Sequence, residues 1–199
     1  MNKKLPILLA LISAALFGSA TPASKVLLDS FSPMQLAGLL YLGAAIGVMP
    51  LLLKNREVKL PRHLSNKNRL YLLGAIFFGG ILAPIFLLLG LQFASSASVS
   101  LWLNLELVAT AILGYCFFQD HLGTIGWMGV VGCVLAAILL SFGEGVAGIE
   151  AALLITIGCI SWGLDNHLTA LIDGISPAQS TFYKGIVAGS INLFLGLLI

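Results

Sequence analysis

The residues of this chain that could do chemistry are ionisable side chains placed inside long apolar stretches. Glu106 is flanked by Asn104 and Thr110 near the middle of one such stretch. A charged side chain at the centre of a bilayer costs about 2.5–3.5 kcal/mol on insertion scales, so each one requires an explanation. A carboxylate that faces a cavity can carry a proton or contact a substrate amine. The alternative is a neutral glutamic acid hydrogen-bonded between helices.

A second polar group lies further along the chain. Asp165, Asn166 and His167 are consecutive in one apolar stretch, and Lys184 lies in the next. An Asp165–Lys184 ion pair would lower the cost of burying both charges, and direct contact of these residues with a substrate is the alternative. His167 could relay a proton or act as a plain hydrogen-bonding residue. The candidate substrate-binding or coupling residues are therefore Glu106, Asn104, Asp165, Asn166, Lys184 and His167.

The first apolar stretch contains a predicted helix break. Gly18 and Thr21 come shortly before Pro22. Because proline has no N–H, it leaves one backbone carbonyl without its helical partner, and a hydroxyl or water can take that place. The alternative is a harmless kink.

Other chemistries find little support in the sequence. Cys116, Cys133 and Cys159 lie in apolar runs without a second cysteine or histidine at ligand spacing, so we expect reduced thiols and no metal. Motifs of hydrolases, metalloproteases and nucleotide-binding loops are missing, so we expect neither catalytic residues nor a cofactor. One alternative is a retinal protein in which Lys184 forms the Schiff base and Glu106 or Asp165 is the counter-ion.

The composition indicates what kind of protein must position these residues. Hydrophobic residues make up 59% of the chain and charged residues 9%, and the mean hydropathy is +1.04. A soluble domain usually carries about 25% charged residues. The chain is therefore predicted to be an all-α bundle in contact with the lipid bilayer. A net charge of +2 gives no reason to expect a nucleic-acid partner.

About seven membrane spans are predicted. A spanning helix needs about 20 apolar residues, because it rises about 1.5 Å per residue through about 30 Å of hydrocarbon. The stretches that meet this criterion are 5–28, 33–53, 70–93, 97–118, 122–142, 149–172 and 177–199. Within them, Gly43 with Gly47 and Gly185 with Gly189 are predicted to let helix backbones approach closely.

The basic residues predict the orientation of the chain in the membrane. Eight of the ten lie at the amino terminus or in the loop after the second span: Lys3, Lys4, Lys54, Arg56, Lys59, Arg62, Lys67 and Arg69. Both segments lie on the same side of the membrane, and positively charged loops stay in the cytoplasm. We therefore expect a multi-pass protein of the inner (plasma) membrane with a cytoplasmic amino terminus.

An internal repeat connects the first and sixth spans. The segment 29–35 reads Asp-Ser-Phe-Ser-Pro-Met-Gln, and 173–179 reads Asp-Gly-Ile-Ser-Pro-Ala-Gln. Five spans separate equivalent positions, and an odd number reverses the direction of crossing. The pattern predicts an inverted-topology repeat, as in many transporters, with 1–145 as a first five-span unit and 146–199 as an incomplete second unit.

Several segments resemble one family of carriers. Leu16-Phe17-Gly18-Ser19, Asn104-Leu105-Glu106 and Trp162-Gly163-Leu164-Asp165-Asn166 resemble the EamA-type carriers of the drug/metabolite transporter superfamily. The resemblance implies ten spans in two inverted five-helix repeats around a cavity, and export of amino acids or other small molecules. This chain has only seven spans. We therefore expect a fragment lacking its carboxy-terminal half, a homo-oligomer, or a truncated subunit that does not transport.

Overall fold

The computed structural model describes residues 4–58, 64–143 and 145–198, and this part of the chain is helical apart from short connections. Seven of its helices are long and apolar enough to cross a membrane. This confirms the predicted all-α bundle of about seven spans. The helical segments are α1 (Lys4–Leu27), α2 (Pro33–Asn55), α3 (Asn66–Ala75), η1 (Ile76–Leu82), α4 (Ala83–Phe93), α5 (Ser96–Trp102), α6 (Leu105–Phe117), α7 (Thr124–Gly143), α8 (Gly145–Ala170) and α9 (Pro177–Leu198).

The third span changes its helical form at mid-length. Between α3 and α4 lies η1, a π-helix in which the Ala83 N–H donates to the carbonyl of Phe78, five residues earlier. Pro84 follows immediately and has no N–H to donate. An N–H at this position would have donated to the Gly80 carbonyl in an α-helix and to the Gly79 carbonyl in a π-helix. Both carbonyls must therefore find other donors.

The fourth span is also interrupted. Its two helices, α5 and α6, are separated by Leu103 and Asn104. The Asn104 side-chain amide donates to the Leu101 carbonyl at 2.9 Å and thereby caps the carboxy-terminal end of α5. Glu106 lies in the first turn of α6, directly after this interruption.

The first span is continuous where a break was predicted. Helix α1 runs from Lys4 to Leu27 with Pro22 inside it. A proline removes one backbone hydrogen bond, and the neighbouring bonds here hold the helical path. The interruptions in the structure are in the third and fourth spans, where the sequence analysis predicts uninterrupted helices.

The two ends of the proposed repeat have the same local structure. Before α2, the Ser32 N–H donates to Gln35 Oε1 at 3.0 Å and the Gln35 N–H donates to Ser32 Oγ at 3.3 Å. Before α9, Ser176 and Gln179 make the same two bonds at 2.9 and 3.3 Å. Each helix therefore begins with a Ser-Pro-x-Gln capping box.

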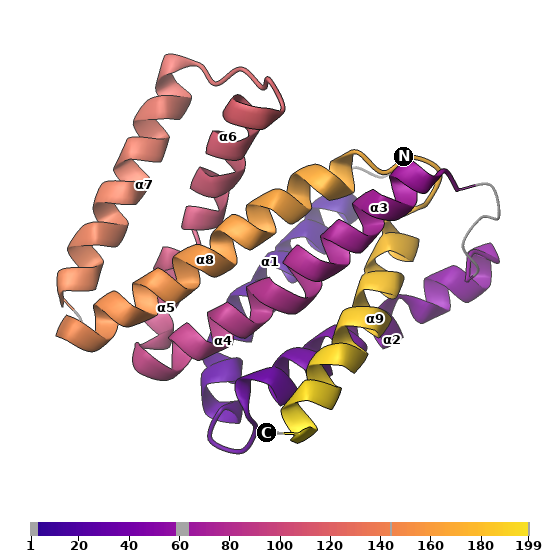
Figure 1. Ribbon diagram of the computed structural model, residues 1–199, viewed down its shortest axis with the longest axis horizontal. Helices are drawn as coiled ribbons and strands as arrows, with labels where there is room; N and C mark the ends of the chain where they lie inside the picture. The colour runs from indigo at the N-terminus through magenta and orange to yellow at the C-terminus, as the bar shows by residue number, and fades with distance from the viewer. Residues whose placement is uncertain (1–3, 59–63, 144, 199) are drawn as a thin grey trace.

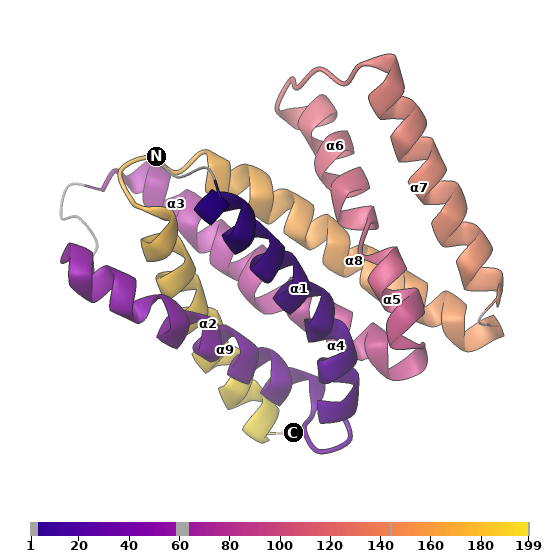
Figure 2. The same cartoon turned by 180° about the vertical axis from the view of Figure 1, so that it is seen from behind.

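The helices pack in two groups that share α8. Figures 1 and 2 show α2 and α9 side by side, and the pair α6–α7 standing apart from them. Helix α8 contacts η1 and α4 on one side and α6 on the other. Because α8 contacts both groups, its polar residues can take part in two different sites.

The antiparallel pair α2–α9 meets at glycines. A Cβ added to Gly38 would lie 2.5 Å from the backbone nitrogen of Leu193, and one added to Gly185 would lie 2.6 Å from the backbone carbonyl oxygen of Tyr41. The predicted pair Gly185 and Gly189 therefore does allow close approach. The predicted pair Gly43 and Gly47 does not take part, because a Cβ at either position would meet nothing within 4 Å. The sequence pattern alone therefore did not show which face of α2 packs against α9.

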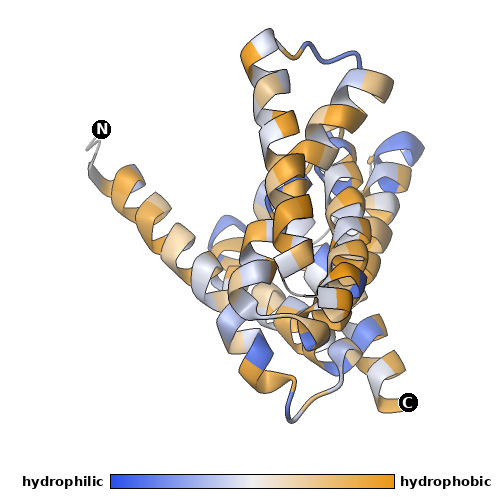
Figure 3. Ribbon diagram, turned by 90° about the vertical axis from the view of Figure 1, so that its left-hand side faces the viewer, coloured by the Kyte–Doolittle hydropathy of each residue, from blue (hydrophilic) through white to orange (hydrophobic). Residues whose placement is uncertain are grey.

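The outward faces of the bundle are apolar. Hydrophobic colour predominates along the helices in Figure 3, whereas the loop between α6 and α7 is hydrophilic. No residue of α7 is buried by the described part of the chain, although α7 is one of the candidate spans. Such surfaces suit contact with lipid or with further transmembrane helices.

We predict that Gly38→Ala destabilises the protein while Gly43→Ala does not. The first change forces a methyl group against the α9 backbone, and overpacking of this kind costs about 1–3 kcal/mol. The second adds a methyl group to open space on the same helix and should be neutral or slightly stabilising. Thermal unfolding in detergent compares the two, and equal midpoints would contradict the α2–α9 packing described here.

Candidate functional site

A buried ion pair connects α8 to α9. Lys184 Nζ lies 2.6 Å from Asp165 Oδ1 and 2.7 Å from Oδ2, and Asp165 is only 6% exposed. Thr169 Oγ1 adds a third donor to Oδ1 at 2.9 Å. The expected pairing of these two residues is therefore present, and the Asp165 carboxylate is fully partnered from within the protein.

The π-helix is packed directly onto this pair. A Cβ added to Gly79 would lie 2.1 Å from Asp165 Oδ2, so a side chain at this position would displace the carboxylate. A Cβ added to Gly80 would lie 2.5 Å from the Ala188 Cβ and 3.2 Å from Lys184 Cγ. Two adjacent glycines thus allow the third span to cover the ion pair.

The two carbonyls left without a donor by Pro84 are satisfied by side chains of other spans. The Gly79 carbonyl accepts from the Tyr41 hydroxyl and from Trp162 Nε1 at 3.1 Å. The Gly80 carbonyl accepts from Asn192 Nδ2 at 3.0 Å. Tyr41, Trp162 and Asn192 were not among the predicted site residues. The sequence signal was the Gly-Gly pair four to five residues before a proline.

A second polar cluster joins α8 to α6. Asn166 Nδ2 lies 3.0 Å from Glu106 Oε1 and 3.2 Å from Thr110 Oγ1. His167 Nε2 lies 2.9 Å from the Thr110 carbonyl oxygen, so this nitrogen must carry the proton. The polar run on α8 therefore divides, with Asp165 directed to η1 and α9, and Asn166 and His167 directed to α6.

A groove lined by both apolar and polar residues lies between α1 and the interrupted fourth span. Its volume is about 410 Å³, and its lining residues are Phe17, Gly18, Thr21, Ser100, Leu103, Asn104, Glu106 and Leu107. The structure thus brings Gly18 and Thr21 of α1 together with Asn104 and Glu106. The other predicted residues, Pro22, Asp165, Asn166, His167 and Lys184, are not among the lining residues. The groove therefore brings four of the predicted residues, from distant parts of the chain, to one open space.

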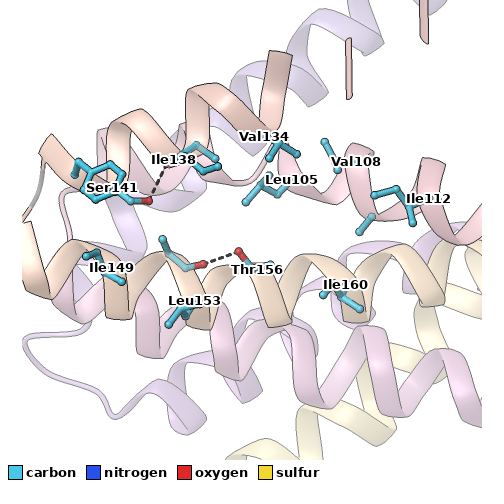
Figure 4. Close-up of a pocket in the computed structure, with 14 residues that line it drawn as sticks. Leu105, Val108, Ile112, Val134, Ile138, Ser141, Ile149, Leu153, Thr156 and Ile160 are labelled. Atoms are coloured by element: carbon cyan, nitrogen blue, oxygen red, sulfur yellow. Dashed lines mark hydrogen bonds between the residues drawn. The ribbon is translucent and has the colours of Figure 1, made fainter. Parts of the chain in front are cut away.

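A second cavity of about 420 Å³ is apolar and lies between α6, α7 and α8. Figure 4 shows its side chains directed between α7 and α8, with Val108 and Ile112 from α6. Its hydroxyl groups are already bonded to their own helices: Ser141 Oγ lies 2.8 Å from the Ala137 carbonyl and Thr156 Oγ1 lies 2.7 Å from the Ala152 carbonyl. This cavity suits hydrocarbon and offers no group that would orient a polar metabolite.

The groups needed for a metal site do not come together in the described residues, where no three His, Cys, Asp or Glu side chains are close enough. Cys159 is buried, and its thiol lies 3.8 Å from the Trp102 carbonyl oxygen.

Comparison with known proteins identifies the family. The model of the EamA-like transporter family matches residues 4–142. The chain belongs to the EamA-like transporter family. A multi-pass membrane protein with seven candidate spans fits this family, as the sequence analysis predicted.

Two relatives of this EamA-like protein are also named as transporters. "Uncharacterized transporter" of Methanothermobacter thermautotrophicus (strain Delta H) is 27% identical over 213 residues, which cover 96% of this chain and 60% of the relative. "Uncharacterized transporter YdfC" of Bacillus subtilis (strain 168) is 31% identical over 132 residues, which cover 65% of this chain and 41% of the relative. The chain therefore spans less than two thirds of the length of each of these relatives. No solved structure matches.

We predict that Asp165→Asn destabilises the protein strongly and that adding Lys184→Met reverses much of the loss. The single change leaves a buried ammonium without its partner, and such changes cost about 3–5 kcal/mol. Replacing both residues removes the uncompensated charge. Unfolding in detergent measures all three proteins. A double variant no more stable than the single one would show that the ion pair does not carry the effect.

Proposed function

We propose that this EamA-like protein is a secondary carrier that exports small metabolites, with Glu106 as the carboxylate that contacts the substrate or the coupling proton. The observation that carries this proposal is the position of Glu106 in an open groove, where no lysine or arginine of the described residues pairs with it. The groove and the family assignment support transport together, because a membrane protein needs no acid in an open groove merely to remain folded.

The contrast between the two intramembrane acids supports the role of Glu106. Asp165 is enclosed, with a lysine ammonium and a hydroxyl on its oxygens. Glu106 receives a single neutral amide, from Asn166, and lines the groove. An acid held only for structure is expected to be partnered as fully as Asp165 is. Asn104, Asn166 and His167 then support the site, and the Asp165–Lys184 pair holds α8 against α9.

The helix arrangement supports a carrier that exposes the groove alternately to the two sides of the membrane. Helices α2 and α9 begin with the same capping box and pack antiparallel to each other, since Gly38 lies against Leu193 and Gly185 against Tyr41. Inverted repeats related in this way rock against each other around a central site in many carriers. We place the amino terminus in the cytoplasm and the protein in the inner membrane, as the basic residues indicate.

Part of the carrier is proposed to come from outside these seven spans. The chain covers 60% of the longer archaeal relative, and α7 presents an unburied apolar surface. The missing helices would be supplied by a carboxy-terminal half or by a second copy. The other candidate is a membrane subunit that does not transport. It follows from the same partial coverage, and it gives Glu106 no role in export.

We predict that Glu106→Gln reduces export by about 10- to 100-fold, because a hydrogen bond to a charged group contributes about 1.5–3 kcal/mol. The measurement is export of metabolites from cells expressing the natural full-length protein, compared by mass spectrometry with cells lacking it. Glu150→Gln is the matched control, since Glu150 is an exposed residue of α8 outside the groove.

Both variants should reach the membrane in the amount of the unchanged protein, measured by a fluorescent fusion. Export by Glu106→Gln equal to that of the unchanged protein would refute the proposed role. A full-length protein that exports nothing would favour the subunit without transport activity.

A further inference from the structure

We propose that the substrate of the groove is an organic cation, recognised through an ammonium group that pairs with Glu106. This inference rests on the proposed function and adds the chemical class of the substrate. It comes from the distribution of charge between the groove and the rest of the membrane-spanning helices.

Lys25 and Lys184, the two lysines inside the seven apolar stretches, are already bound elsewhere. Lys184 Nζ is held by Asp165 at 2.6 Å. Lys25 Nζ donates to the carbonyls of Leu91 and Gln92 at 2.6 and 3.1 Å. In the described part of the chain, Asp165–Lys184 is the only ion pair. Neither of these lysines pairs with Glu106, and a charged substrate can supply a cation.

The Glu106 carboxylate is prepared for a second partner. Its Oε1 accepts from Asn166, and no further donor to this carboxylate is found among the described residues. It lies in the first turn of α6 and lines the groove. Asn104 uses its Nδ2 on the Leu101 carbonyl, which leaves its Oδ1 as an acceptor for an ammonium N–H.

The other groove residues indicate an organic cation and not a bare ion. A volume of about 410 Å³ is far larger than one ion needs, and Leu103 and Leu107 add apolar wall to it. The Phe17 ring is 71% exposed and lines the same space, where its face can attract a cation. Of the groove's lining residues, only Glu106 is charged, so a substrate carboxylate would meet repulsion and no counter-charge.

The test compares three probes that share a phenyl ring and a two-carbon stem: 2-phenylethylamine, 2-phenylethanol and 3-phenylpropionate. Their binding to the natural full-length protein in nanodiscs is measured by calorimetry, with empty nanodiscs correcting for partition into lipid. The amine should bind at least about tenfold more tightly than the alcohol or the carboxylate. Glu106→Gln should remove this preference and Glu150→Gln should keep it.

A second variant keeps the test decisive if Glu106→Gln folds poorly. Phe17→Leu changes an exposed side chain and no charge, and should weaken amine binding about two- to fivefold more than alcohol binding. Equal binding of the amine and either other probe would overturn the cation class, as would unchanged amine binding in Glu106→Gln or binding of none of the three. Export lost in Glu106→Gln without an amine preference would leave a carrier for another substrate class, whereas unchanged export would refute the proposed function itself.

Discussion

Hydrocarbon offers no hydrogen bonds, so every polar group inside the membrane must find its partner within the protein or its ligand. Pro84 shows how this constraint organises the bundle. By lacking an N–H, it leaves the Gly79 and Gly80 carbonyls to be satisfied from other spans. Tyr41, Trp162 and Asn192 supply the donors. One proline thus ties α2, α8 and α9 to the middle of the third span, directly over the Asp165–Lys184 pair.

The same constraint distinguishes the candidate site from the structural network around it. Asp165 and the π-helix carbonyls are matched by protein donors. Glu106 receives one amide from Asn166 and otherwise faces the groove beside α1. Only 6% of the most apolar window of α1 is buried by the described part of the chain, so this side of the groove is not enclosed by other helices. An incompletely paired acid in such a groove is suited to binding a charged substrate.

Composition and span length were sufficient to predict the all-α architecture, since a chain with 9% charged residues cannot cover a surface facing water. The Asp165–Lys184 contact was predictable because two buried charges at similar depth lower each other's cost. The side-chain donors of the π-helix were not, because their partners lie 38 to 112 residues away in the chain. Likewise, Pro22 indicated a break that α1 does not show, whereas Gly79-Gly80 before Pro84 marked the interruption of the third span.

The most direct test of the central claim, that Glu106 is open to ligand while Asp165 is closed, is chemical labelling of carboxyl groups within the membrane. The full-length protein in native membranes is treated with the apolar reagent dicyclohexylcarbodiimide, and modified peptides are quantified by mass spectrometry. We predict modification of Glu106, protection of Glu106 by 2-phenylethylamine, and little modification of Asp165. Equal labelling of both acids, or labelling of Asp165 alone, would contradict the account.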